Sequence, residues 1–417
     1  MCSGPKFDHR QFGAEKGLFC FPSEGGSGFA FWGPKGCKLV DIVRSYINEF
    51  QEKVCGIQLV KTPVLGKKEL YKKTGHLELY AENIFPPMCS DKEEFVLRPM
   101  TCPHHILLAK ELIQGYRQLP FLMGENSILH RNEYSGGLLG LKRVRTMELI
   151  DTHIFLMPEH AHNLINSCLT WVWTLLKKFQ IEIKEIVLAT RSDSQKYLCD
   201  VNEWSKSESV LFASAEEWAK KNDLSTKLVT KKGEAAFYGP KIDFNVVDTS
   251  NQDYTISTIQ LDILMANRLG FTVIGPDQQD VNPWIIHLGL IGTLERFIAY
   301  LLERWEGTLP FWLSPQQISI IPIDQEKYLN VCKRLQAQLT ELGFRVKIDE
   351  GKERFSKKIL NSVQERVNIQ LLIGEREASS LETISFRELG SEAPRELPWA
   401  EFISYLKELN SEAEIKV

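Results

Sequence analysis

The sequence predicts a large α+β domain, with a central antiparallel sheet flanked by helices, followed by a small α/β domain. Strand-like residues 121–133 and 143–155 surround a glycine-rich loop, which indicates a long antiparallel hairpin. Beyond the break at 311–317 the pattern becomes strand-helix-strand-helix-strand, and this order favours parallel pairing. We therefore predict domains at residues 1–311 and 312–417.

The other elements of the first domain follow from apolar spacing and from turn residues. Residues 1–16 are expected to form a polar, irregular lead-in. Strands are predicted at 17–21, 29–32, 57–65, 95–100, 181–191, 235–248 and 253–265. Helices are predicted from Pro34 to about Gly56 and at 67–80, 103–115, 158–179 and 192–225. Residues 284–305 begin as a strand and turn into a helix at the glycines.

The second domain has a simpler alternation. Strands are predicted at 317–323, 344–348, 369–374 and 383–389. Helices are predicted at 325–342, at 353–366 and from Trp399 onward.

Composition narrows the class of protein. A chain of 417 residues with 43% hydrophobic content can bury a large core. A net charge of -4 argues against a protein that coats nucleic acid nonspecifically. The 9 cysteines form no CxxC pair, which is typical of a reduced intracellular protein. The sequence contains neither a signal-peptide apolar segment nor a run long enough to span a membrane.

The densest chemistry lies at residues 97–153. Arg131, Glu133 and Arg143, together with Arg145 and the distant Arg296, form a candidate anion site, because guanidinium groups on rigid strands suit phosphate oxygens. The sequence has no Walker loop and no GxGxxG motif, so arginines on strands would have to hold any nucleotide. Solvated charge on a hairpin is the alternative.

A second candidate site combines Cys102, His153 and His287. One thiolate and two imidazoles suit a zinc ion whose fourth position stays open to a substrate. The spacing has no local signature, so a buried cysteine and ordinary core histidines remain the alternative.

A third group of basic residues lies in the second domain. Its side chains suit a nucleic-acid backbone, with a solvated helix face as the alternative. The group comprises Lys352, Arg354, Lys357, Lys358 and Arg366.

Together these segments resemble the threonyl-tRNA synthetases, class II enzymes of the bacterial or organellar type. RPMTCPHH resembles the stretch around the family's zinc-binding cysteine, and LHRNEYSGGLLGLKRVR resembles motif 2, with matching spacing to DTHIF. FYGPKIDF and STIQLD match two further family strands, and IIHLGLIGTLERF resembles motif 3. The helix from Pro34 with the strand at Pro63 resembles motif 1, and ISIIPI onward resembles the anticodon-binding domain. The resemblance covers essentially the whole chain.

The resemblance implies a role for each matching position. The zinc ligands would be Cys102, His153 and His287. The ATP-binding positions would be Arg131, Glu133, Arg143, Thr258 and Arg296. The threonine-binding positions would be Met100, Asp151, Tyr238, Lys241 and Gln260. His76 would lie near the 3′ end of the tRNA, and Glu377 and Arg387 would read the anticodon.

The implied activity is ATP-dependent attachment of threonine to tRNA(Thr) through a threonyl-adenylate, with magnesium accompanying ATP. Zinc would bind the amino and hydroxyl groups of threonine, so valine is rejected for lack of a hydroxyl. A homodimer and a cytoplasmic location are expected, with an organellar matrix as the other compartment. The family's N-terminal editing domain is expected to be missing, which predicts seryl-tRNA formation without self-correction.

Several positions depart from the family pattern: His104, Met147, Leu149, Ile150, Thr255 and Leu288. Met147 stands where the family places a phenylalanine on the adenine, and methionine makes a less defined contact with a base. These departures keep open a catalytically degenerate synthetase-like module that binds tRNA or threonine. A class II relative that charges serine or proline is a third reading, which the Cys-His-His group opposes.

Overall fold

The computed structural model describes residues 7–192, 197–198, 201–249, 251–391 and 393–415. The chain forms two compact units. The first contains Phe21–Ala30 and Asn48–Tyr300, and the second contains Phe7–Cys20, Phe31–Ile47 and the chain from Leu301 onward. The domain limits proposed from the sequence stay a prediction.

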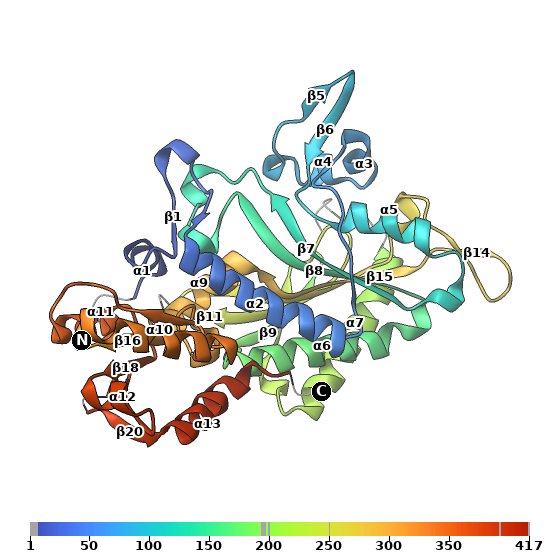
Figure 1. Cartoon of the computed structure of the whole chain (residues 1–417). Helices are drawn as coiled ribbons and strands as arrows, with labels where there is room; N and C mark the ends of the chain where they lie inside the picture. Colours follow the sequence, from blue (N-terminus) through green and yellow to red (C-terminus); the bar gives the residue numbers. More distant parts are fainter. Residues whose placement is uncertain (1–6, 193–196, 199–200, 250, 392, 416–417) are drawn as a thin grey trace. The chain divides into compact units, whose positions relative to one another are not determined.

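Among the described residues, an 8-stranded sheet with the order β10-β9-β11-β12-β15-β8-β7-β3 is the frame of the first unit (Figure 1). Its strands are β3 (Gln58–Leu59), β7 (Phe121–His130), β8 (Thr146–Leu156), β9 (Glu185–Thr190), β10 (Leu228–Lys232), β11 (Lys241–Val247), β12 (Asp253–Asp262) and β15 (Trp284–Thr293). From β9 through β11, β12, β15 and β8 to β7, each strand pairs antiparallel with the next. At the two edges of this sheet, β10 pairs parallel with β9 and β3 pairs parallel with β7. The predicted antiparallel central sheet is confirmed.

The predicted hairpin is also confirmed. β7 and β8 pair from Phe121 opposite Phe155 to His130 opposite Thr146. Ten consecutive cross-strand pairs hold the two strands in one register, so the side chains that β8 presents to each face of the sheet are set.

Two long helices cover the sheet side by side in Figure 1, α6 (Ala161–Lys178) and α7 (Val201–Lys221). On α6, Ile165, Val172 and Leu176 are fully buried, as the helical spacing predicts, whereas Leu164 and Trp171 on the same apolar side are only partly buried. The sequence predicted one helix over 192–225; part of that range, residues 193–196 and 199–200, lies outside the described residues.

Smaller elements complete this unit. They are α3 (Lys68–Lys73), α4 (His76–Leu79), α5 (Cys102–Leu112), α8 (Met265–Arg268), β4 (Leu65–Lys67), β5 (Met88–Ser90), β6 (Glu93–Leu97), β13 (Val273–Ile274) and β14 (Asp280–Val281). β4, β6 and β5 form a separate antiparallel sheet beside α3 and α4 (Figure 1). The long helix α2 (Pro34–Lys53) and the helix α9 (Leu294–Arg304) each contribute residues to both units.

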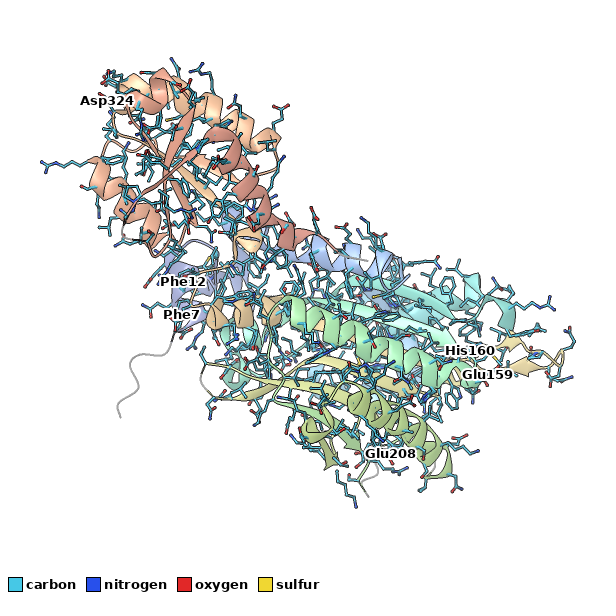
Figure 2. The ribbon with its side chains drawn as sticks, turned by 90° about the horizontal axis from the view of Figure 1, so that it is seen from below. Phe7, Phe12, Glu159, His160, Glu208 and Asp324 are labelled. Carbon is cyan, nitrogen blue, oxygen red and sulfur yellow. The ribbon has the colours of Figure 1, made fainter. Side chains whose placement is uncertain are left out.

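The second unit contains a sheet of order β17-β16-β18-β19-β20. Its elements are β16 (Ile318–Pro322), α10 (Gln325–Glu341), β17 (Val346–Ile348), α11 (Phe355–Gln364), β18 (Ile369–Ile373), α12 (Glu375–Ser379), β19 (Thr383–Glu388), β20 (Arg395–Pro398) and α13 (Trp399–Asn410). β16 pairs parallel with both β17 and β18, as predicted, and β19 and β20 continue antiparallel. Asp324, labelled in Figure 2, caps α10 by accepting a hydrogen bond from the amide of Lys327 at 3.1 Å.

The expectation of an irregular lead-in was wrong for its described part. α1 (His9–Glu15) is a helix whose N-cap, Asp8, accepts a hydrogen bond from the amide of Arg10 at 2.8 Å. The rings of Phe7 and Phe12 lie 5.1 Å apart (Figure 2). This short helix has little apolar periodicity, so the capping aspartate was the available signal. The strands β1 (Phe19–Cys20) and β2 (Phe31–Trp32) pair as a short hairpin.

No helix in the described ranges is long and apolar enough to cross a membrane.

One glycine allows the close approach of β11 and β12. A Cβ added to Gly239 would lie 2.0 Å from the carbonyl oxygen of Leu261. We predict that Gly239→Ala lowers the free energy of unfolding by about 1–3 kcal/mol, because backbone must move to admit the methyl group. Gly115→Ala is the matched control, since its nearest neighbour is 3.8 Å away. Urea unfolding of both variants is the measurement; equal losses would contradict the packing argument.

Candidate active site

Strand register places the candidate residues in two rows across the sheet. Lys241 pairs with Gln260, Gln260 with His287, and His287 with His153. The neighbouring row runs Asp243, Thr258, Gly289, Asp151 and Glu125. Residues directly opposite each other point to the same face of a sheet, so both rows face one side.

A cavity of about 610 Å³ lies over this face, a size typical of a small-molecule site. It brings together the predicted catalytic-domain residues with two exceptions, His76 and Arg145; the guanidinium of Arg145 donates instead to the carbonyl oxygens of Glu133 and Ser27. The predicted residues that line it are Met100, Cys102, Arg131, Glu133, Arg143, Asp151, His153, Tyr238, Lys241, Thr258, Gln260, His287 and Arg296.

The Cys-His-His group is compact. Ligand atoms of Cys102, His153 and His287 all lie within 4.8 Å of one another, and the three side chains are buried. His153 and His287 are cross-strand partners on β8 and β15, while Cys102 is the first residue of α5. The sequence named these residues without any local signature; the fold joins them.

Each histidine of the group is oriented through its second ring nitrogen. Asp262 Oδ2 lies 2.9 Å from His287 Nε2, and the other oxygen of Asp262 accepts hydrogen bonds from the amides of Leu264 and Met265. His105 Nδ1 lies 2.8 Å from His153 Nδ1. These contacts leave His287 Nδ1 and His153 Nε2 as the nitrogens available to a metal. One sulfur and two oriented imidazoles are a donor set that fits zinc.

Burial controls protonation in this group. It raises the pKa of the Cys102 thiol well above its usual range, with a further contribution from the charge of Asp151. It lowers the pKa of His153 well below its usual range. A bare site therefore holds a protonated thiol and a neutral imidazole, and a bound dication would displace the thiol proton. Burial also raises the pKa of Asp151.

Polar side chains beside the group hold one another in place. The hydroxyl of Tyr238 donates to Gln260, and the ammonium of Lys241 donates to Asp243. Asp243 also accepts from the hydroxyl of Thr258 at 2.9 Å. The sequence analysis did not name Asp243. Its position two residues after Lys241 in a predicted strand, on the same face, was the signal that could have found it.

The other end of the cavity is basic. Arg143 donates to Glu133 Oε2 through Nε at 2.9 Å and Nη2 at 2.7 Å. Arg131 donates to the carbonyl of Pro99 at 3.3 Å, and its guanidinium lies over the ring of Tyr80. Burial lowers the pKa of Arg296, and the nearby positive charge of Arg131 lowers it further. Guanidinium groups converging on one cavity are suited to phosphate oxygens.

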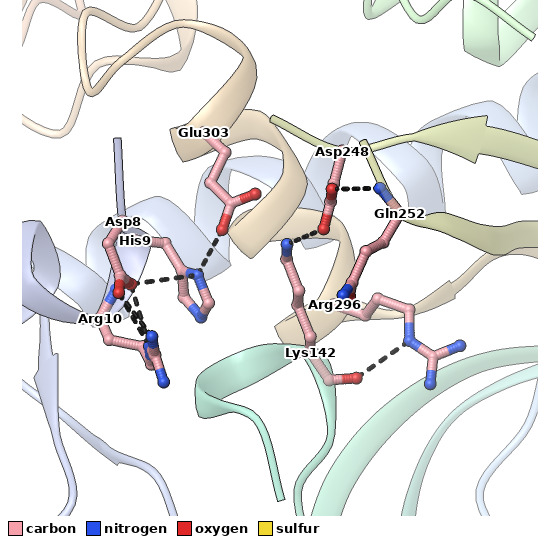
Figure 3. A network of polar contacts seen from close by, with 8 residues as sticks. All are labelled: Asp8, His9, Arg10, Lys142, Asp248, Gln252, Arg296 and Glu303. Atoms are coloured by element: carbon pink, nitrogen blue, oxygen red, sulfur yellow. Dashed lines mark hydrogen bonds and ion pairs between the residues drawn. The ribbon is translucent and has the colours of Figure 1, made fainter. Parts of the chain in front are cut away.

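Arg296 contacts the backbone of Lys142, whose side chain forms a part-buried ion pair that was not predicted from the sequence (Figure 3). Its Nε donates to the carbonyl of Lys142 at 3.1 Å. The ammonium of Lys142 in turn donates to Asp248 Oδ2 at 2.6 Å, and Asp248 also accepts from the amide of Gln252 at 2.9 Å.

Figure 3 also draws His9, whose Nδ1 lies 2.6 Å from Glu303 Oε1 in the second unit.

His76 lies beside the cavity and is fully buried. Its Nε2 lies 3.3 Å from the sulfur of Met100 and 3.8 Å from that of Cys102, and its Nδ1 lies 2.7 Å from Thr74 Oγ1. Burial lowers its pKa to about 3, so this imidazole is neutral. Gly75, at φ 79, makes the left-handed turn that precedes it.

The departures from the family pattern fall into two groups. Met147, Leu149 and Thr255 line the cavity. Ile150 and Leu288 are fully buried and alternate with cavity-facing neighbours, so they belong to the other face of the sheet. His104 contacts the hydroxyl of Tyr71 at 3.2 Å.

The predicted anticodon residues lie in the second unit. Glu377 is buried on α12 and accepts from the amide of Gly374 at 3.1 Å and the hydroxyl of Ser385 at 2.9 Å. Arg387, on β19, donates to the carbonyl of Ser391 at 2.8 Å. In the basic group, Lys358 is buried and donates to the carbonyl of Asp349 at 3.3 Å, so the group is not uniformly a solvated face.

Two protein families match the chain in the order that the sequence predicted. The family described as tRNA synthetase class II core domain (G, H, P, S and T) matches residues 87–305. The family described as anticodon binding domain matches residues 317–409. With the antiparallel sheet and its cavity, these matches define a class II synthetase core followed by an anticodon-binding domain.

Relatives narrow the class further. A threonine–tRNA ligase from Geobacillus kaustophilus is 39% identical over 96% of this chain, and one from Ureaplasma parvum is 38% identical over 96%. A crystal structure described as the RNA binding domain of threonyl-tRNA synthetase from Cryptosporidium parvum Iowa II has a TM-score of 0.89 at 31% identity and covers 96% of this chain and 98% of that one. The chain belongs to the threonyl-tRNA synthetase family. It spans 60% of the Geobacillus protein and 68% of the Ureaplasma protein.

The Lys142–Asp248 pair supports a testable statement about stability. Lys142→Met removes the ammonium that is ion-paired with the buried carboxylate of Asp248, and we expect the free energy of unfolding to fall by about 3–5 kcal/mol. Lys142→Met/Asp248→Asn should recover part of that loss. Lys184→Met, which breaks the exposed pair with Asp253, should cost no more than about 1 kcal/mol. Denaturant unfolding compares the three; a loss for Lys142→Met no larger than the control's would contradict the argument.

Proposed function

We propose that this chain attaches threonine to tRNA(Thr) in two ATP-dependent steps, as a threonine–tRNA ligase. The observation that carries the proposal is the pairing, in one cavity, of the Cys102–His153–His287 group with the arginines 131, 143 and 296. The first end suits an amino acid with neighbouring amine and hydroxyl groups, and the second suits phosphates. The match to threonine–tRNA ligases over 96% of the chain supports the same activity.

The amino-acid end selects by bonding rather than by size. Zinc, held by Cys102, His153 and His287, supplies a Lewis acid to which an amine and a hydroxyl can both bind. Asp151 lies in the neighbouring row of the same face and is placed to accept a hydrogen bond from the substrate. Tyr238 and Gln260 are hydrogen-bonded to each other, and they line the same cavity together with Met100 and Lys241.

The phosphate end stabilises charge. In the first step a carboxylate oxygen of threonine attacks the α-phosphorus of ATP, the bond to pyrophosphate breaks, and threonyl-adenylate forms. Arg131, Arg143 and Arg296 are fixed by protein partners and bear the developing negative charge, aided by magnesium bound with ATP. We assign Glu133 to accept a hydrogen bond from the adenine amine and Thr258 to ATP binding; both residues line the same cavity.

In the second step a hydroxyl of the terminal ribose of the tRNA attacks the carbonyl carbon of threonyl-adenylate, the bond from that carbon to the phosphate oxygen breaks, and AMP leaves together with the hydroxyl proton. We assign His76 to the 3′ end of the tRNA, and residues 312–417, with Glu377 and Arg387, to anticodon binding. We also propose a homodimer, which the likeness to motif 1 implies, and a cytoplasmic or organellar-matrix location.

The degenerate module remains the second candidate. Met147 and Leu149 line the cavity, and Met147 would make a less defined contact with a nucleotide base than an aromatic ring would. The presence of the Cys-His-His group together with Arg131, Arg143 and Arg296 favours catalysis, because a protein that only binds tRNA or threonine would not need both.

The decisive assay is amino-acid-dependent ATP–pyrophosphate exchange on zinc-loaded protein. We expect exchange with threonine and weaker exchange with serine, which has the same amine and hydroxyl. Valine should be disfavoured by about 10⁴-fold or more, because it leaves hydroxyl-binding groups unpaired. Folded, zinc-loaded protein that exchanges with none of these amino acids would support the binding module instead.

Metal removal gives an independent test. Stripping zinc with a chelator should abolish exchange with threonine, and readdition of zinc should restore it, because the hydroxyl and amine lose their common partner. Nucleotide binding, measured by calorimetry, should survive chelation, since the arginines hold ATP. Exchange that persists after complete zinc removal would show that the metal does not select threonine.

A further inference from the structure

His104 and His105, the two consecutive histidines within residues 97–153, have no part in the function proposed above. His105 lies on α5 and is 0% exposed. Its Nδ1 lies 2.8 Å from Nδ1 of His153, and the two ring centroids are 4.8 Å apart with the planes nearly perpendicular. His105 therefore touches a proposed metal ligand on the side that faces away from the metal.

The other ring nitrogen of His105, Nε2, contacts a buried carboxylate. Its Nε2 lies 3.2 Å from Glu125 Oε2. Arg98 donates to the second oxygen of Glu125 at 2.7 Å, and the hydroxyl of Thr62 donates to Oε2 at 2.6 Å. Arg98 and Glu125 are 1% and 3% exposed, so the contacts that lead from His105 through Glu125 to Arg98 lie in the interior. Buried polar groups in such a chain are expensive to leave unpaired.

Two ring nitrogens 2.8 Å apart must share one proton, which restricts the tautomers. A His153 that binds a metal through Nε2 carries its proton on Nδ1 and donates it to His105 Nδ1. His105, whose Nδ1 accepts that hydrogen bond, then donates from Nε2 to Glu125. This arrangement satisfies every member of the chain, whereas the opposite tautomer of His153 would place a proton where the metal binds.

We infer that His105 is a positioning residue: anchored by Glu125 and Arg98, it selects the tautomer and ring orientation of His153 that bind the metal. The inference rests on the zinc site proposed above. Partners of this kind typically change metal affinity by about 10- to 100-fold when removed.

Side-chain geometry offers a sharp test. The amide of asparagine lies near the position of histidine Nδ1, and that of glutamine reaches the position of Nε2. His105→Asn therefore keeps a polar contact with His153 and loses Glu125, while His105→Gln keeps Glu125 and loses His153. His105→Leu loses both. His104→Asn and His104→Gln are matched controls, because His104 is the adjacent buried histidine and contacts Tyr71 instead.

The zinc dissociation constant of each full-length variant, from competition with a chromophoric chelator, is the main readout. We expect about 10- to 100-fold weaker zinc binding for His105→Gln and His105→Leu. His105→Asn and both His104 variants should stay close to the unmodified chain. The visible spectrum of the cobalt-loaded protein should change in the same order, because it reports ligand geometry. Thermal unfolding of the metal-free proteins checks that each variant folds.

Three results would overturn the inference. Folded His105→Gln and His105→Leu that bind zinc like the unmodified chain would remove the role of His105. Equal losses for His105→Asn and His105→Gln would show that the Nδ1 contact is not what matters. An unmodified chain that binds no zinc would instead remove the proposed metal site, and the inference with it, which a zinc titration of that chain alone reveals.

Discussion

The antiparallel register from β11 to β8 is the constraint on which the site depends. Directly opposed residues share a face, so His153, His287, Gln260 and Lys241 meet although they are far apart in the sequence. If the pairing of any of these strands shifted by one residue, the side chains that this strand contributes to the row would point to the opposite face of the sheet. The close approach allowed by Gly239 and the ten consecutive pairs of β7 with β8 hold that register.

Burial has different consequences at the two ends of the cavity. At the cysteine end burial raises the pKa of the Cys102 thiol and lowers the pKa of His153, so these two groups are uncharged in the absence of a metal ion. At the arginine end the guanidinium groups cannot lose their charge, and protein carbonyls and Glu133 hold them until an anion arrives. One cavity thus combines a candidate metal site with a cluster of guanidinium groups.

The sequence predicted the sheet, the hairpin and the parallel strands of the second unit, because periodicity and glycine turns are local signals. Motif likeness added Cys102, His153 and His287, which no spacing rule could have joined. What the sequence could not predict are partners chosen by tertiary contact. His105 was visible as half of a histidine pair, but its bond to His153 depends on how α5 meets β8. Asp262 and the Lys142–Asp248 pair were missed for the same reason.

The central claim is that Cys102, His153 and His287 hold a zinc ion that reads the hydroxyl of threonine. X-ray absorption at the zinc edge tests it directly, with and without threonine. The account predicts one sulfur neighbour at about 2.3 Å, nitrogen neighbours at about 2.0–2.1 Å, and additional light-atom neighbours when threonine, but not valine, is added. A zinc environment without sulfur, or one that threonine leaves unchanged, would contradict it.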